Sequence, residues 1–243
     1  QGILKFTERD WAQGPEAFKR LLLEKNIGIL EEIVVQHPDM AKLCPTSVNT
    51  CRIATLLGDK KQGIVYAFLR IGNGKVMDNV DCGGMAARID LESGKLLTVG
   101  ADKQGNTYEK HPMTGTPIVG FTIPYWEEAK AMCLEAAQVV PQMRFVAWDV
   151  AITPNGPTFI EGNSFPSHAV PQFAAHYPDG IGNSLICKRK TLLLILQQRL
   201  SFILPSALFQ SPARDRVRFA EPPLRCSCCF HIQSAHNAVR YAD

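Results

Sequence analysis

The most informative segment of the sequence is Trp148-Asp149-Val150-Ala151-Ile152-Thr153-Pro154-Asn155-Gly156-Pro157-Thr158-Phe159-Ile160-Glu161-Gly162-Asn163. Two runs rich in apolar and β-branched residues flank Pro154-Asn155-Gly156, which predicts a β-hairpin with a three-residue loop. Such a loop pairs Thr153 with Pro157, and counting outward from that pair places Asp149 opposite Glu161. One face of the hairpin is then a core face and the other carries polar oxygen atoms: Trp148, Val150, Ile152 and Ile160 on the first, and Asp149, Glu161 and Asn163 on the second.

Two carboxylates placed directly opposite each other repel, so the pairing of Asp149 with Glu161 calls for a cation or a shared proton. Together with the amide of Asn163 they offer hard oxygen atoms, which suit Mg²⁺ better than zinc. Mg²⁺ held by few protein oxygens keeps ligand positions for phosphates, which predicts a nucleotide-phosphate site. The alternative is a solvated face whose like charges are relieved by nearby Lys or Arg. A register slip of one residue would place the two carboxylates on opposite faces.

Outward from the hairpin, the first 183 residues predict an α+β fold, mostly antiparallel sheet with packed helices. Residues 37–48 are expected to form an irregular link and 102–124 a long functional loop, because prolines and glycines punctuate both. Helices are expected at 14–26 and 125–140, and strands at 27–36, 50–57, 63–71, 84–90, 95–101, 144–153 and 157–163.

Charge divides the 243-residue chain near residue 183. Residues 1–183 carry 17 basic and 20 acidic side chains, whereas 184–243 carry 9 and 3, together with four of the eight cysteines. We therefore expect one folded domain over 1–183 and a loosely ordered, basic, Cys-containing tail over 184–243 that is not part of the fold. The Cys-x-Cys-Cys-x-His spacing of the tail matches no zinc pattern, and its arginines lack an aromatic platform, so no nucleic-acid binding is expected.

The sequence also predicts a cytoplasmic protein without a membrane span. Residues 1–5 show no signal-peptide pattern, and the apolar run 192–208 is too short and too polar to cross a bilayer. The cysteines of the first domain lie scattered in strand-like and helix-like patterns, which favours buried free thiols over a disulfide framework. These cysteines are Cys44, Cys51, Cys82 and Cys133.

Short motifs extend the pattern on both sides of the hairpin. In order they are Gln36-His37-Pro38, Asn49-Thr50-x-Arg52, Arg70 with Asn79-x-x-x-Gly83-Gly84, His111-Pro112-x-Thr114-Gly115, Ile123-Pro124-x-Trp126, Trp148-Asp149-Val150-Ala151 and Glu161-Gly162-Asn163. This order resembles the ATP-grasp superfamily, and most closely the sugar-transfer-associated ATP-grasp family, which is related to the glutamate-ligase branch. The resemblance covers about 27–173 and implies a partial ATP-grasp fold, because the N-terminal part of the family pattern has no counterpart.

The resemblance implies a role for each matching residue. Asp149, Glu161 and Asn163 would hold Mg²⁺ that bridges the phosphates of ATP. Arg52 and Arg70 would contact the γ-phosphate or an acyl phosphate, and Asn79 would lie near the transferring group. The segment 30–35 resembles the hinge strand that holds adenine. It would therefore place Glu31, Glu32 and Val34 at the adenine and ribose.

The implied reaction is ligation, in which a carboxylate is activated as an acyl phosphate and attacked by an amine or a hydroxyl. The expected partners are small or saccharide-linked carboxylate and amine substrates, with polysaccharide or cell-envelope modification as the expected setting. The family's lysine and glycine-rich loop lie upstream of the hinge and are missing from the pattern. This chain alone is therefore expected to bind ATP weakly and turn over poorly. The alternatives are an inactive nucleotide-binding remnant or an interaction module, and the sequence predicts no oligomeric state.

Overall fold

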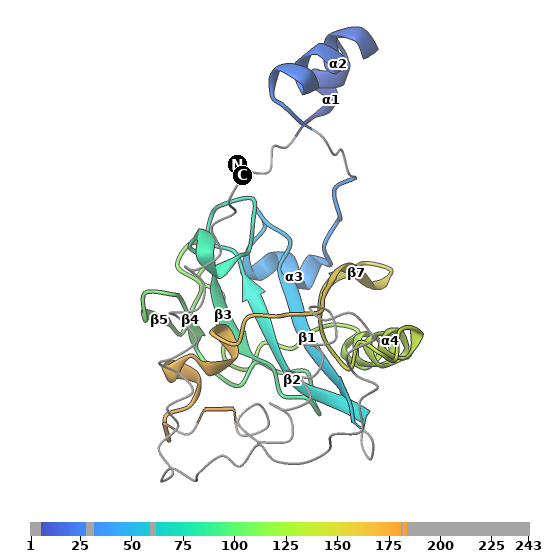
Figure 1. Cartoon of the computed structure of the whole chain (residues 1–243). Helices are drawn as coiled ribbons and strands as arrows, with labels where there is room; N and C mark the ends of the chain where they lie inside the picture. The colour runs from blue at the N-terminus through green and yellow to red at the C-terminus, as the bar shows by residue number, and fades with distance from the viewer. Residues whose placement is uncertain (1–5, 28–31, 59–61, 181, 184–243) are drawn as a thin grey trace, which may run out of the picture.

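A computed structural model describes residues 6–27, 32–58, 62–180 and 182–183. Its centre is a seven-stranded antiparallel sheet in the order β5-β4-β3-β2-β1-β6-β7 (Figure 1). The strands are β1 (Thr50–Leu57), β2 (Gln62–Ile71), β3 (Met85–Arg88), β4 (Gly100–Ala101), β5 (Thr107–Tyr108), β6 (Phe145–Thr153) and β7 (Gly156–Asn163). The helices are α1 (Glu8–Trp11), α2 (Pro15–Glu24), α3 (Pro38–Leu43) and α4 (Trp126–Val139), with 3-10 turns η1 (Val80–Cys82), η2 (Val170–Gln172) and η3 (Ala174–His176). The predicted mixture of antiparallel sheet and helices is confirmed.

The two faces of the sheet differ in what covers them. One face packs against α3 and α4, and its core includes Cys51, Ile53, Leu69, Val150 and Ile152, each fully buried. The other face carries a smaller apolar cluster around Tyr66, Phe68, Ala86 and Ala147, against which Val170 and Phe173 pack. Because side chains alternate along each strand, the strands that build the core also supply the residues of the second face.

Helix α4 lies close to the sheet because its inward face is made of small residues. Ala129, Cys133 and Ala137 recur at a spacing of four and are buried, and Trp126 occupies the same face one turn earlier. The indole N–H of Trp126 donates to the carbonyl of Leu91 at 3.1 Å, which fixes the start of the helix. The predicted helix at 125–140 is thus confirmed.

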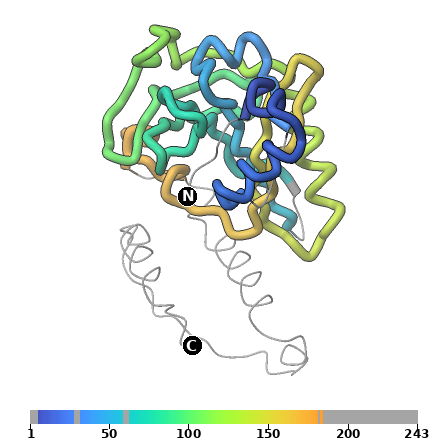
Figure 2. Tube along the Cα trace, turned by 90° about the horizontal axis from the view of Figure 1, so that it is seen from above, coloured from blue at the N-terminus to red at the C-terminus, as the bar shows by residue number. Residues whose placement is uncertain are grey.

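Helices α1 and α2 form a separate pair that stands away from the sheet in Figure 1. The ring of Phe18 on α2 makes edge contacts with those of Phe6 and Trp11. Pro15 occupies the first turn of α2, where its missing N–H costs nothing, and the helix predicted at 14–26 is confirmed. In Figure 2 the green loop around β4 and β5 and the yellow β6–β7 hairpin lie on opposite sides of the molecule. This agrees with the strand order.

Three predicted elements are wrong in whole or in part. Residues 32–36 form no strand, and 28–31 lie outside the described residues. Ile33 and Val35 are largely exposed. Branched side chains favour a β-strand only where a neighbouring strand pairs with them, so they did not suffice to form one here. The link at 37–48 contains α3, which Pro38 begins and the His37 ring caps by accepting from the backbone N–H of Asp39 at 3.1 Å. The strand predicted at 95–101 is reduced to β4, with isolated bridges before it.

The β6–β7 hairpin reaches the predicted pairing by a different route. Its loop has two residues, so Thr153 pairs with Gly156 and Val150 with Phe159, one residue out of the predicted register. A bulge at Ile160 then shifts the register back, and Asp149 pairs with Glu161 as predicted. The bulge also turns Ile160 outward, where it is 47% exposed, so its predicted place on the core face is wrong.

The cysteines in the described part of the chain are all free thiols. Cys44, Cys51 and Cys133 are buried as predicted, whereas Cys82 on η1 is only half-buried. Burial raises the pKa of the Cys133 thiol to about 12, so this side chain behaves as a small apolar group. Among the described helices, none combines the length and the apolar character needed to cross a bilayer.

Candidate functional site

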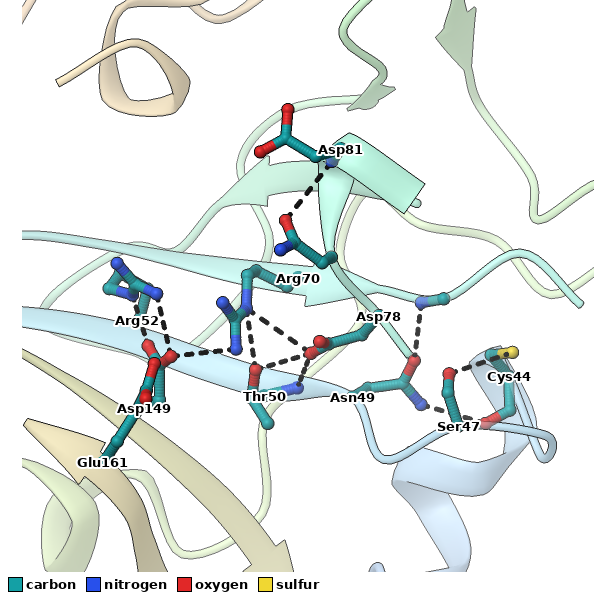
Figure 3. A network of polar contacts seen from close by, with 12 residues as sticks. Cys44, Ser47, Asn49, Thr50, Arg52, Arg70, Asp78, Asp81, Asp149 and Glu161 are labelled. Carbon is teal, nitrogen blue, oxygen red and sulfur yellow. Dashed lines mark hydrogen bonds and ion pairs between the residues drawn. The ribbon is translucent and has the colours of Figure 1, made fainter. Parts of the chain in front are cut away.

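A row of opposed side chains crosses the second face of the sheet. Arg52 on β1 pairs with Asp149 on β6, and Asp149 pairs with Glu161 on β7. Residues directly opposite each other in antiparallel strands share a face and lie close together, so this register alone brings one guanidinium and two carboxylates into contact distance. Figure 3 shows all three side chains converging from the three strands.

Asp149 is the centre of this cluster and is fully buried. Nε and Nη2 of Arg52 both contact its carboxylate, and Nη2 lies 2.8 Å from Oδ2. Arg70, from β2, adds a third contact from its Nη2 to Oδ2 at 2.9 Å. Two guanidinium groups that are only 13% and 14% exposed therefore share a single carboxylate (Figure 3). Such paired, charge-assisted contacts hold all three groups in fixed directions.

A second carboxylate completes the surroundings of Arg70. Its Nε donates to Thr50 Oγ1 at 2.9 Å and lies 3.5 Å from Asp78 Oδ2. The same Asp78 oxygen accepts from the backbone N–H of Thr50 at 2.9 Å and from the Thr50 hydroxyl. Arg70 is thus held between two buried carboxylates, Asp78 and Asp149, and points along the sheet face rather than into solvent.

The pKa values of the three acids move in different directions. Burial raises the pKa of Asp149, while Arg70 and Arg52 oppose that rise. Burial likewise raises the pKa of Asp78, again opposed by Arg70 and by the Thr50 hydroxyl. The pKa of Glu161 is lowered instead, first by the hydrogen bond from Asn163 and then by Asp149. The two opposed carboxylates therefore lie in different environments, which move their pKa values apart.

Asn163 joins the cluster through Glu161, because its Nδ2 donates to Glu161 Oε1 at 3.1 Å. Asp149, Glu161 and Asn163 thus lie in one chain of contacts at the end of the hairpin. Two touching carboxylates with a neighbouring amide are oxygen donors of the kind that Mg²⁺ takes. In the described residues no group of three or more His, Cys, Asp or Glu side chains is placed to hold a metal.

The loop after β2 positions Asp78 through two glycines. Gly83 has φ +91°, in the left-handed region that L residues rarely adopt. A Cβ on Gly84 would lie 2.4 Å from the carbonyl oxygen of Asp78, so only glycine lets the chain pass so close. Asn79 is exposed, and its side-chain oxygen accepts from the backbone N–H of Asp81 at 3.2 Å. Asn79 therefore caps η1, and its implied place near a transferring group stays a prediction.

The start of β1 is fixed by a buried amide pair. Asn49 is fully buried and donates through Nδ2 to the oxygen of the Gln36 side chain and to the carbonyls of Met40 and Cys44. Its own oxygen accepts from the backbone N–H of Gly72 at the end of β2. These bonds tie α3, β1 and β2 together, and they set the frame from which Thr50, Arg52 and Arg70 project.

The two histidines that precede prolines have structural roles, as their loop positions suggest. The His111 ring is buried and its Nε2 lies 2.7 Å from the carbonyl oxygen of Gly72. The backbone N–H of His37 donates to the carbonyl of Ile152 at 2.7 Å, which anchors the 32–37 segment to β6.

Two of the three residues predicted at the adenine lie at the tip of the hairpin. Glu32 and Val34 line an open groove of about 410 Å³ together with Thr153 and Thr158, whereas Glu31 lies outside the described residues. Through the pairing of Ala151 with Thr158, Thr158 is on the same sheet face as Asp149. Groove and charged cluster therefore lie along one face of one hairpin.

The sequence patterns did not identify Asp78 as a site residue. They included Thr50 in a motif but assigned it no role in the site. Nothing in the local sequence distinguishes Asp78 from the neighbouring Asp81, which is exposed and pairs with Lys103. Only the turn built by Gly83 and Gly84 folds Asp78 back onto the strands, so the glycine pair was the available signal.

The sequence model of a family described as "Sugar-transfer associated ATP-grasp" matches residues 22–181, which is more than half of the chain. No curated protein matches the chain.

Proposed function

The chain belongs to the sugar-transfer associated ATP-grasp family, and we propose that it forms the catalytic part of an ATP- and Mg²⁺-dependent ligase. The proposed reaction activates a carboxylate as an acyl phosphate, which an amine or a hydroxyl then attacks. The observation that carries this proposal is the buried Asp149, which two arginines and Glu161 contact at once.

In the proposed mechanism, the charged groups of the cluster exchange their partners when ATP binds. Arg52 and Arg70 neutralise Asp149. When the phosphates of ATP arrive, the two guanidinium groups turn to them, because Arg binds phosphate through paired hydrogen bonds. Asp149, Glu161 and Asn163 would then be able to hold Mg²⁺, which would supply positive charge against the phosphates. Under this proposal Asp149 would exchange one positively charged partner for another and would stay paired.

In the proposed first step, a carboxylate oxygen of the acid substrate attacks the γ-phosphorus of ATP, and the bond to the β-phosphate oxygen breaks to release ADP. Arg52 and Arg70 hold the equatorial oxygens of the transferring group, which positions it in line. In the second step the amine or hydroxyl attacks the acyl carbon, loses its proton, and inorganic phosphate leaves. Thr50 and Asp78 act as positioning residues, because they fix the direction of Arg70.

The hairpin offers a path for the nucleotide along its length. The groove at Glu32 and Val34 would take the adenosine end, and the carboxylate end of the hairpin the phosphates. Thr153 lies four positions after Asp149, which at the rise of a β-strand is about 13 Å. An extended nucleotide spans such a distance, and this agreement supports the proposed orientation.

A second function is favoured by one specific observation, namely that Arg52 and Arg70 pair with Asp149 within the chain itself. A domain that binds nucleotide without turning it over would keep the same cluster for stability alone. Release of ADP that depends on an added acid and an added amine or hydroxyl distinguishes the ligase from this alternative. The proposed setting is modification of a polysaccharide or of the cell envelope, with a small or saccharide-linked acid or amine as substrate.

The proposal is tested by calorimetric titration of the full chain with ATP, with and without Mg²⁺. Binding that requires Mg²⁺ is expected for the wild type, and Glu161→Gln is expected to lower the affinity at least roughly tenfold, because it removes a charged oxygen ligand. Glu128→Gln is the matched control, since Glu128 is exposed on α4 and outside the cluster. Unchanged affinity in Glu161→Gln would refute the metal assignment, and equal binding without Mg²⁺ would refute the proposed site.

A further inference from the structure

A pocket of about 510 Å³ lies beside the charged cluster, on the same face of the sheet. The side chains that matter in its wall are Tyr66, Phe68, Arg88, His176, Tyr177 and Asp179. Its size falls within the range of roughly 300–1,000 Å³ found for small-molecule sites. Pro171 of η2, His176 of η3 and residues after them also line it, so the pocket lies between these turns and the sheet.

The register of the strands places this pocket next to the proposed reaction centre. Phe68 on β2 pairs with Arg52 on one side and with Arg88 on β3 on the other. The row that begins at Glu161 and Asp149 therefore continues through Arg52 and Phe68 to Arg88. Two strand spacings of about 4.8 Å separate Arg88 from Arg52. A molecule of moderate size in the pocket reaches both arginines.

Arg88 is a half-buried cation without a counter-ion. Its Nη1 donates to the carbonyl of His176 at 3.0 Å, and its guanidinium lies over the ring of Tyr177 at 4.4 Å from the centroid. Within the described part of the chain it makes no ion pair. Arg52 and Arg70, on the same sheet face, are both paired with carboxylates. A guanidinium with unused donors in a pocket wall is suited to an anionic oxygen group.

Two buried polar atoms in the same wall lack partners among the described residues. The hydroxyl of Tyr66 is one, in a residue only 5% exposed, and Nδ1 of His176 is the other, in a residue 1% exposed. Buried polar groups without partners are rare and costly, and both belong to the same pocket. The second unpaired atom is independent of the first, since Tyr66 comes from β2 and His176 from η3.

The hydrogen bond at Nε2 of His176 determines whether Nδ1 is a hydrogen-bond donor or an acceptor. Nε2 lies 2.9 Å from the carbonyl oxygen of Ala86, which can only accept, so Nε2 carries the proton. Burial lowers the pKa of His176 to about 4, so the ring is neutral near pH 7. Nδ1 is then an acceptor and requires a donor, such as a hydroxyl group. The Tyr66 hydroxyl, by contrast, can donate to an oxygen or accept from one.

We propose that this pocket binds the part of the acid substrate remote from its reacting carboxylate, and that this part carries hydroxyl groups and an anionic oxygen group at about monosaccharide size. Arg88 holds the anionic group, and Tyr66 and His176 hydrogen-bond to hydroxyls. The flat rings of Tyr66 and Phe68, stacked at 6.0 Å and 14°, form an apolar surface beside them. This inference rests on the proposed ligase function. The anionic group is a carboxylate or a phosphate, and the experiment separates the two.

The test is calorimetric titration of the full chain with D-glucuronate, D-glucose 6-phosphate and D-glucose. At least one of the two anionic sugars is expected to bind saturably, and D-glucose at least roughly tenfold more weakly, because it offers Arg88 no charge. Tighter binding of glucuronate identifies a carboxylate, and tighter binding of the phosphate ester identifies a phosphate. Equal binding of all three sugars, or binding of none, would overturn the inference.

Tyr66→Phe separates recognition from folding. It removes only the unpaired hydroxyl, so thermal stability is expected to stay equal or rise, while affinity for the anionic sugar falls roughly three- to tenfold. Tyr108→Phe is the control, since the Tyr108 hydroxyl donates to Asp102 outside the pocket and its loss is expected to leave affinity unchanged. Arg88→Gln is expected to abolish the preference for anionic sugars over D-glucose. Wild-type affinity in both Tyr66→Phe and Arg88→Gln would overturn the inference.

The outcome is distinguishable from that of the proposed function. Glu161→Gln is expected to lose Mg²⁺-dependent ATP binding and to retain sugar binding, because Glu161 does not line the pocket. A chain that binds Mg²⁺-ATP but no sugar refutes only the pocket. A chain that binds the anionic sugar but no nucleotide refutes only the ligase.

Discussion

The two faces of the sheet are made by the same strands, yet they use opposite chemistry. Toward α3 and α4 the strands present side chains such as Leu69 and Val150, which are fully buried and make only apolar contacts. On the other face the neighbouring positions, Arg70 and Asp149, are nearly as buried but are charged. Burial alone therefore does not distinguish a structural from a functional face. What distinguishes them is whether the buried groups need partners of specific charge.

The largest expected effect of a single change comes from the charged face. Asp149→Ala leaves Arg52 largely buried without its carboxylate and leaves Arg70 with Asp78 alone, and the free energy of unfolding is expected to fall by about 4 kcal/mol. Urea unfolding measures this. Glu161→Gln on the same row is the control, expected to cost less than about 1 kcal/mol because Glu161 is exposed. A small loss for Asp149→Ala would mean that the two arginines find water instead.

The second largest expected loss of stability comes from a change on the apolar face. Leu69→Ala removes a fully buried side chain from the core and is expected to lower the free energy of unfolding by about 3 kcal/mol, through lost burial and the cavity left behind. Affinity for Mg²⁺-ATP, measured where the variant is still folded, is expected to stay within about twofold of wild type. A large loss of affinity at full folding would show that the two faces are not separable in this way.

Gly162 lies where the hairpin serves both faces, between Glu161 and Asn163. A Cβ there would lie 2.9 Å from Cζ3 of Trp148, which packs over the glycine on the apolar side. Gly162→Ala is expected to cost about 2 kcal/mol of unfolding free energy by overpacking. Gly63→Ala is the matched control, because a Cβ at Gly63 meets nothing within 4 Å. Equal stability of the two variants would show that Trp148 moves aside freely.

The smallest expected effect is a pH dependence from the buried His176 of η3. The folded-state pKa of His176 is about 4, below the ordinary value of 6.5, so the unfolded chain binds more protons between these values. The neutral ring thus contributes stability that is fully present above pH 6.5 and is lost as pH falls toward 4. Between pH 7 and 5.5 the loss is expected to be about 1 kcal/mol. His176→Gln is expected to flatten the curve by that amount, and an unchanged slope would contradict the assignment.

Strand periodicity and turn chemistry predicted most of the sheet, because β1, β2, β6 and β7 carry clear alternation between turn residues. The same patterns failed at 32–36, where the branched residues have no neighbouring strand, and at Pro38, which begins a helix that was expected to be irregular. The pairing partner of a strand depends on the whole fold, so it cannot be predicted from the sequence of a single segment.

The candidate site was predictable where it depends on strand register and unpredictable where it depends on loops. The approach of Asp149 to Glu161 and of both to Arg52 follows from three paired strands. The contribution of Asp78 depends on a backbone turn at Gly83, and the pocket depends on the segment that ends at residue 183. Neither is encoded in a periodic pattern. The predicted pairing of Asp149 with Glu161 is correct although the predicted loop is wrong, since the bulge compensates for the shorter turn.

The bulge at Ile160 gives the hairpin a spare residue that can be accommodated in either of two places. If the extra residue lay in the turn, the loop would have three residues, and Phe159 and Ile160 would exchange sheet faces. The extra residue instead lies in the strand as a bulge, which gives the observed register. Both solutions leave the acidic pair untouched. The tip that borders the proposed adenosine groove can therefore be reshaped by evolution or by an engineer, through an insertion matched to a deletion, while the chemistry at the other end of the hairpin stays in register.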